Sequence, residues 1–151
     1  MKAYPWGKGT VKWLRDDAPN DSDKSFPVPA GKVWDVLSIA YELVASAVVG
    51  NRQMAVYITD GTDALWTTVP SPAVAALTPC NGRFAPNLPT DNTTQLARLD
   101  TYGWSSTISV TGPLPRLLLP AGHVVRVSDY KAIDPAGDPL VVVLQYVEYD
   151  A

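Results

Sequence analysis

The chain has 151 residues, a formal net charge of −3 and one cysteine. This length suits a single domain, one cysteine excludes an intrachain disulfide, and the acidic balance argues against a nucleic-acid backbone as the main partner. Only 2 of the 15 acidic residues are glutamate, a good helix former, whereas valine and threonine, which suit strands, number 18 and 12. The composition therefore predicts an all-β protein.

The first 15 residues carry four cations and no acid, and aspartates dominate the next eight residues. We expect a strand over Thr10–Arg15 and a polar elbow over 16–25, which divides the chain into an arm and elbow, 1–25, and a β-sandwich domain, 26–151. Exposed tryptophan and tyrosine are typical interface anchors, and cations steer association. The docking candidates on the arm are Tyr4, Trp6, Lys8, Lys12, Trp13 and Arg15. A solvated arm with a flexible acidic elbow is the alternative.

We expect neither a signal peptide nor a membrane span in this sequence. The N-terminus lacks the apolar stretch of a signal peptide, and no segment reaches the about 20 apolar residues of a membrane span. We therefore expect a protein that is made and used in a cytosol, without a membrane partner.

A short phrase occurs twice. Val-Pro-Ala-Gly at 28–31 returns 91 residues later as Leu-Pro-Ala-Gly at 119–122, and a β-rich run follows each copy. Two equivalent turns into strands favour a sandwich of two sheets. Strands are predicted over 33–44, with a bulge near Val36 where the apolar phase changes, and over 53–59, 64–69, 104–110, 124–130 and 140–149. Gly50-Asn51 predicts a hairpin between the first two of these strands.

Residues 70–103 interrupt the strand pattern. They hold five prolines and many asparagines and threonines, so we expect a long loop with one helical turn over 71–77 and a second short helix over 93–99. A loop of this length in a small domain is uncommon unless it has a function, and it is the alternative docking site to the arm. The fold expected is an antiparallel, jelly-roll-like β-sandwich.

The sequence gives little support for a catalytic or a metal site. His123 is the single histidine, and its counterpart in the repeat is Lys32, so neither a proton-shuttling triad nor a histidine metal cluster is expected. Cys80 is expected to be a buried thiol. The aspartates at 60–63 and 134–138 fit ordinary turns better than calcium loops. We expect no enzyme, no cofactor and no metal.

A function of another class is also possible for this sequence, and it depends on Trp66, Tyr102 and Trp104. Three aromatic rings near loops favour a stacking platform for sugars, as in a carbohydrate-binding module. A flat exposed row would favour this glycan platform, whereas burial between subunits would favour assembly.

The order of turns and strands from Phe26 to Gly61 resembles β-sandwich virion proteins of tailed bacteriophages. The matching features are the turn at 28–31, the long strand, the turn at 49–52 and the strand that ends at 58–61, and residues 114–122 are similar in rhythm. Together they cover under half of the chain. The resemblance implies a structural virion protein, made in the host cytoplasm, of the capsid decoration or cement type, or else a tail, collar or head-fibre part. It also implies a homo-oligomer, with a trimer as the expected form, bound to the major capsid protein or another virion protein.

Overall fold

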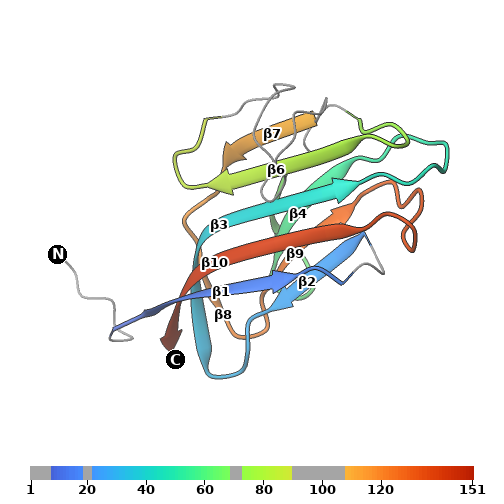
Figure 1. Ribbon diagram of the computed structural model, residues 1–151. Helices are drawn as coiled ribbons and strands as arrows, with labels where there is room; N and C mark the ends of the chain where they lie inside the picture. Colours follow the sequence, from blue (N-terminus) through green and yellow to red (C-terminus); the bar gives the residue numbers. More distant parts are fainter. Residues whose placement is uncertain (1–7, 19–21, 69–72, 90–107) are drawn as a thin grey trace.

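The computed structural model describes residues 8–18, 22–68, 73–89 and 108–151 and contains two stacked β-sheets (Figure 1). Within these residues no helix occurs, and therefore no helix that could cross a membrane. The predicted all-β sandwich is confirmed. The strands are β1 Thr10–Asp16, β2 Asp23–Pro27, β3 Lys32–Val44, β4 Met54–Thr59, β5 Ala64–Thr68, β6 Pro79–Ala85, β7 Ile108–Pro113, β8 Leu118–Pro120, β9 Val124–Asp129 and β10 Leu140–Asp150.

The strand order is that of a jelly roll. Sheet A has the order β1-β10-β3-β6-β7, with β8 paired to β3, and sheet B has the order β2-β9-β4-β5. Eight strands form nested antiparallel pairs, β4·β5 inside β3·β6, then β2·β9, then β1·β10. Alternate pairs lie in alternate sheets, which is the double Greek key of jelly rolls. β7 extends sheet A by pairing parallel to β6.

The core lies between the sheets and depends on a bulge in β3. Ile39, Tyr41 and Leu43 point into the core, as do Trp34 and Val36. These two sets have opposite phases along the strand, and the register against β10 shifts between Gln145 and Tyr146. The bulge expected near Val36 is thus confirmed, and it keeps both halves of β3 buried.

The two copies of the repeat form matching turns that are bonded to each other. The Lys32 and His123 amides donate to the carbonyl oxygens of Pro29 and Pro120, at 3.2 Å in both turns. Gly31 and Gly122 occupy the third position with φ of 71° and 87°, a conformation that glycine tolerates best. The Val28 amide donates to the His123 carbonyl at 2.8 Å, and the Gly122 amide to the Val28 carbonyl at 3.2 Å. The repeat therefore closes one end of the sandwich, where the chain crosses between sheets.

Four sequence expectations are wrong. The elbow over 16–25 contains the start of β2, which pairs with β9, so residues before 26 contribute strands to both sheets. Gly50-Asn51 does not join a hairpin, because β3 and β4 lie in different sheets. The loop expected over 70–103 contains β6, a central strand of sheet A. Residues 73–77 are not helical, and the helix expected over 93–99 lies outside the described residues.

The sequence does not predict β6, because its composition is unusual for a strand. Glycine and asparagine are depleted in strands, and Gly82 and Asn81 stand in the middle of this one. The structure explains the glycine, because a Cβ at Gly82 would lie 2.2 Å from the ring of buried Tyr41. Tyr41 fills the space that a side chain of β6 would otherwise occupy.

Candidate docking surface

The described part of the N-terminal arm is mostly strand. Lys8 is exposed just before β1, and Lys12, Trp13 and Arg15 lie on β1, which is an edge strand because it pairs with β10 alone among the described strands. Tyr4 and Trp6 lie outside the described residues. The structure thus places part of the docking set on a rigid sheet rather than on a separate arm.

Alternation along β1 separates its side chains into two sets. Trp13 and Arg15 lie opposite Gln145 and Val143 of β10 and share their face, which points away from the core. Lys12 lies opposite Tyr146, a core residue, and points to the other side. Trp13 is 62% exposed, an uncommon degree for the largest side chain.

Lys12 has a partner within the chain. Its Nζ donates to Glu148 Oε1 at 2.6 Å, while Trp34 Nε1 donates to Glu148 Oε2 at 3.1 Å. The Lys12 bond, the largest influence, outweighs burial and holds the pKa of Glu148 below its ordinary value. Lys12 therefore ties β1 to β10 on the inward side of the sheet.

The side chain of Arg15 is more available to a partner than that of Lys12. Its Nε donates to Asp17 at 3.0 Å, but both side chains are more than half exposed. Exposed ion pairs of this kind contribute about 0–1 kcal/mol to stability. The guanidinium can thus exchange Asp17 for another carboxylate at little cost.

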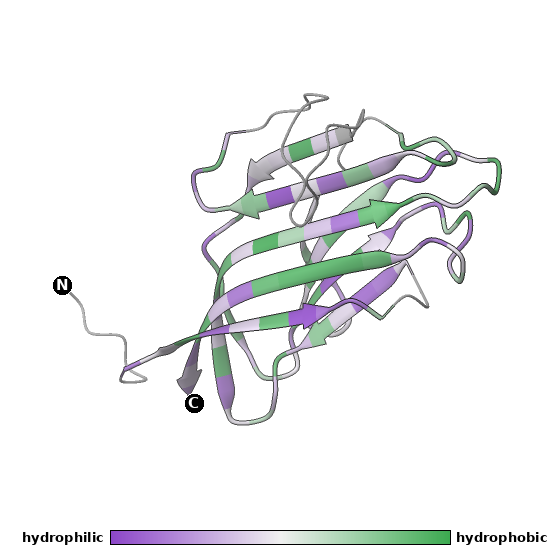
Figure 2. Ribbon diagram, viewed as in Figure 1, coloured by the Kyte–Doolittle hydropathy of each residue, from purple (hydrophilic) through white to green (hydrophobic). Residues whose placement is uncertain are grey.

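Trp13 belongs to an apolar stripe on the outer face of sheet A, the face turned toward the viewer in Figure 1. On β10 the inward residues are buried, while every second residue between them is half buried and points outward. Val11 and Val44 are 54% and 40% exposed on the flanking strands. Figure 2 shows β10 apolar along most of its length. The apolar side chains of this outer face are Val11, Trp13, Ala40, Val44, Val141, Val143 and Val147.

Polar side chains limit the stripe. Glu42 and Arg83 lie toward β6, and Ser38 and Gln145 form a small polar pair, Ser38 Oγ donating to Gln145 Oε1 at 3.4 Å. Near the crossing turns, buried Asp35 accepts from Arg116 Nη2 at 2.6 Å. The outer face therefore carries a row of valines that one polar pair interrupts, with charged side chains toward β6 and the crossing turns, and such a mixture of apolar and polar groups is common in protein interfaces.

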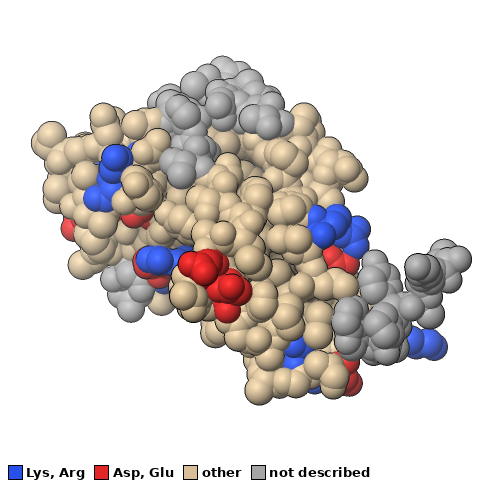
Figure 3. All heavy atoms as spheres, turned by 180° about the vertical axis from the view of Figure 1, so that it is seen from behind, with Lys and Arg blue, Asp and Glu red and all other residues tan. Residues whose placement is uncertain are grey.

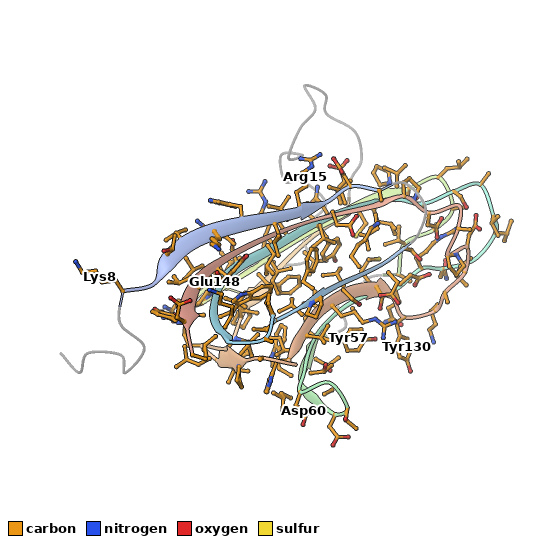
Figure 4. All side chains as sticks on the ribbon, turned by 90° about the horizontal axis from the view of Figure 1, so that it is seen from below. Lys8, Arg15, Tyr57, Asp60, Tyr130 and Glu148 are labelled. Carbon is orange, nitrogen blue, oxygen red and sulfur yellow. The ribbon has the colours of Figure 1, made fainter. Side chains whose placement is uncertain are left out.

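The outer face of sheet B is different. Arg126 on β9 binds Asp23 of β2 through two nitrogens and lies 5.8 Å from the centre of the Tyr57 ring. Figure 3, seen from behind, shows small groups of blue and red side chains on a mostly uncharged surface. Figure 4 shows Arg15 and Tyr57 on opposite sides of the sandwich. Charge pairing on sheet B leaves sheet A as the better docking candidate.

Sequence reasoning missed a buried ion pair at the end of the sandwich away from the repeated turns. Arg52 and Asp138 are both fully buried and form two bonds, of 2.8 and 3.1 Å. Arg52 also donates to Ser46 Oγ and to the carbonyl oxygens of Val48 and Gly50. All five guanidinium hydrogens have acceptors, so this pair joins the loop between β3 and β4 to the loop between β9 and β10 and leaves no donor for a ligand.

The remaining chemical candidates lie in unreactive settings. Burial raises the pKa of Cys80 to about 12, so the thiol stays protonated and is a poor nucleophile. His123 is half buried, and its Nδ1 has no hydrogen-bond partner among the described residues. Lys32, its counterpart, binds Asp150 at 2.5 Å. The described residues contain no group of three His, Cys, Asp or Glu that could hold a metal.

Of the three residues of the predicted glycan platform, Trp66 lies within the described residues. Trp66 is half buried and packs edge-on to the Phe84 ring, with ring centres 6.4 Å apart, so one face of this indole belongs to the core. Tyr102 and Trp104 lie outside the described residues.

Comparisons with known proteins do not assign this chain to a family. No family model and no curated protein matches the chain. The solved structure of infectious bursal disease virus Gx strain is similar over 93% of this chain and 41% of that chain, at 16% sequence identity and a TM-score of 0.29. The chain thus spans about two fifths of that structure's chain, and a likeness of this size carries no argument for function.

Proposed function

We propose that the chain is a structural virion protein of a tailed bacteriophage, most specifically a capsid decoration or cement protein that is made in the host cytoplasm. It binds the major capsid protein or another virion protein and stabilises the particle by burying surface. The observation that supports this most is the apolar outer face of sheet A, with Trp13 exposed at its edge. Exposed apolar patches of this kind mark protein contacts.

The fold alone does not select this function. Jelly rolls occur in viral capsids, lectins and cupins, so function has to be argued from the surface. Here Trp13 shares one face of β1 with the cation Arg15, and Lys8 is exposed just before the strand begins. A tryptophan anchor contributes about 2 kcal/mol or more when buried in an interface, and flanking cations raise the association rate. A partner surface with an apolar socket and acidic border fits this arrangement.

The proposal includes the absence of catalysis. Among the buried titratable groups that the structure describes, Arg52 and Asp138 bind each other, and Cys80 stays protonated. These contacts support a role in assembly. None of them places one of these groups in an open cleft with a pKa near the working pH, as a catalytic acid or base requires.

Mass spectrometry of purified particles tests the virion role. We expect the chain to be present in a fixed high copy number, and a decoration protein to be removable without loss of the head. Deleting residues 1–7 and substituting Trp13→Ala should each weaken attachment, whereas Leu65→Ala, at an apolar position on sheet B that is 50% exposed, should not. Absence of the chain from particles would refute the proposal. Labelling on the tail, collar or fibres would favour those sites over the head.

A further inference from the structure

We infer that one end of the sandwich is a further docking surface, at which Val49 and Leu77 enter an uncharged apolar socket on a partner protein. This surface, the apolar end, consists of residues 44–50 at the end of β3 and residues 73–79 at the start of β6. Its role rests on the proposed function, which makes the partner a virion protein.

The two segments of the apolar end lie side by side. The Ala45 amide donates to the Thr78 carbonyl oxygen at 3.3 Å, and the Leu77 amide donates to the Ser46 carbonyl oxygen at 3.0 Å. Figure 1 shows the loop after β3 and the start of β6 at the same end of the sandwich. Side chains from both segments therefore belong to one surface.

This surface is apolar and uncharged. Neither segment contains an aspartate, glutamate, lysine or arginine, and Figure 2 shows apolar colours at the tip of the loop after β3. Val48 and Val49 are 47% and 91% exposed, and Leu77 is 73% exposed. Clusters of exposed apolar side chains mark contact sites. The other exposed side chains of the two segments are Val44, Ala47, Ala73 and Ala75.

Leu77 is a poor choice of residue for a free surface. Its φ is 59°, in the left-handed region where a leucine is strained and where glycine or asparagine fits better. The side chain gains little burial within the chain in return for this strain. Strained residues concentrate at binding sites, where the surroundings hold them in place. Burial by a partner gives the leucine the contacts that the chain itself does not provide.

Val49 is held in a fixed position from beneath. Arg52 Nη1 donates to the carbonyl oxygens of Val48 and Gly50, on either side of Val49, at 2.7 and 2.9 Å. Arg52 is fixed in turn by its buried ion pair with Asp138. These carbonyl groups need no water when a partner covers them, and an ordered loop loses little conformational entropy on binding. The buried ion pair therefore positions Val49 for a partner.

Charge complementarity sets the chemistry of the socket. A charge of the partner placed against these segments would lose its water without gaining an ion pair, which is costly. The socket is therefore apolar and uncharged. Val44 lies both at this end and on the outer face of sheet A, so the apolar end continues the candidate docking surface that carries Trp13. One partner protein can contact both.

A lipid bilayer fits the apolar end less well. The side chains of Val48, Val49 and Leu77 offer about ten carbons, fewer than the about fourteen of a myristoyl chain, which alone binds membranes only marginally. Neither segment offers a cation to an anionic headgroup, and the whole chain has a net charge of −3. A protein socket adds its own apolar surface and a complementary shape to the same burial.

Phage particles produced without this chain provide the binding partner for the test. The purified full chain is added back, and the fraction that sediments with the particles gives the dissociation constant. Leu77→Asn and Val49→Asp should each raise this constant about tenfold or more, because each removes one aliphatic side chain from the socket. Leu65→Asp is the matched control, since Leu65 is 50% exposed on sheet B, and it should leave the constant unchanged.

Two measurements separate binding from folding. Asparagine adopts a left-handed backbone more readily than leucine, so Leu77→Asn should melt at the same or a higher temperature than the wild-type chain while it binds more weakly. Val49→Cys that carries a benzophenone maleimide should cross-link to one particle protein, at an apolar peptide. The wild-type chain controls for stray labelling, since its one cysteine, Cys80, is buried.

The outcomes distinguish this docking surface from the virion role. If Leu77→Asn and Val49→Asp bind particles as tightly as the wild-type chain, the inference is overturned and the virion role stands. If the wild-type chain itself does not bind, the virion role is refuted and the partner with it. Binding of the wild-type chain, but not of Val49→Asp, to vesicles of phosphatidylcholine and phosphatidylglycerol would assign the apolar end to a bilayer instead. Self-association that Leu77→Asn abolishes would assign it to a second copy, and either result would overturn the inference.

Discussion

Replacing Arg52 by methionine probes the buried ion pair most directly. Methionine keeps most of the volume but removes every donor, so the Asp138 carboxylate remains fully buried with the Ser46 amide, at 2.7 Å, as its remaining described donor. Ser46 Oγ and the carbonyl oxygens of Val48 and Gly50 lose a donor at the same time. The variant therefore leaves one buried charge and several acceptors without their partner.

The expected cost follows from this geometry. Removing one member of a buried pair destabilises a protein by about 3–5 kcal/mol, because the other charge stays buried and uncompensated. In a domain of this size about 1 kcal/mol lowers the melting temperature by about 2–4 °C. Arg52→Met should thus lower the melting temperature by roughly 6–20 °C.

Thermal unfolding followed by circular dichroism measures this effect, and Arg126→Met is the matched control. Arg126 also binds an aspartate through two nitrogens, but both side chains are more than 40% exposed. The control should cost about 0–1 kcal/mol. Arg52→Met with Asp138→Leu should recover much of the loss, since apolar replacement of both charges is often neutral. Equal destabilisation by Arg52→Met and Arg126→Met would refute the argument from burial.

Three further predictions concern pH, thiol reactivity and glycine. Burial acts to raise the pKa of Asp138, but the hydrogen bonds from Arg52 and Ser46 outweigh it and hold this pKa below its ordinary 3.8. The stability that these bonds contribute is therefore complete above about pH 4 and is lost as pH falls through the lower pKa of the folded state. An acid titration of the stability of Asp138→Asn should lack this component. With its pKa at about 12, Cys80 should resist alkylation at pH 8 until the chain unfolds, as read by mass spectrometry. Gly31→Ala should cost about 1–2 kcal/mol through backbone strain alone, because open space surrounds it, whereas Gly82→Ala, which meets the Tyr41 ring, should cost more in a urea titration. Alkylation of folded protein, or a smaller cost at Gly82, would contradict these two expectations.

The sequence predicts the strands that alternate cleanly. β1, β3, β4, β5 and β10 lie within one or two residues of the predicted bounds, because apolar or β-branched residues recur along each of them and turn residues flank them. The bulge was also readable, since Trp34 and Val36 are out of phase with Ile39 and Tyr41. Local pattern is sufficient where burial repeats along one strand.

Pairing between distant strands is less accessible. Nothing near Gly50 shows that β3 and β4 belong to different sheets, and the glycine of β6 looks like a loop residue until Tyr41 is placed over it. Arg52 and Asp138 are 86 residues apart and each resembles a surface turn residue in sequence. Trp13 and Arg15 occupy alternate positions of one predicted strand, so the sequence places them on one face, and their docking role stays a prediction. The run of apolar residues on β10 does not show in the sequence which of its faces is open. Which face stays open depends on tertiary structure.

The nested pairing of the strands also implies an order in which the chain folds. A four-residue turn, 60–63, separates β4 from β5, so this hairpin closes a short loop and costs the least entropy. Once it has formed, the ends of β3 and β6 are close, and each outer pair then closes a loop already shortened by the pair inside it. The β1·β10 pair closes last in this sequence, although its partners are more than 120 residues apart along the chain. The strand that carries Trp13 is therefore added to a sandwich that is otherwise complete, and this surface is assembled only after the core that supports it.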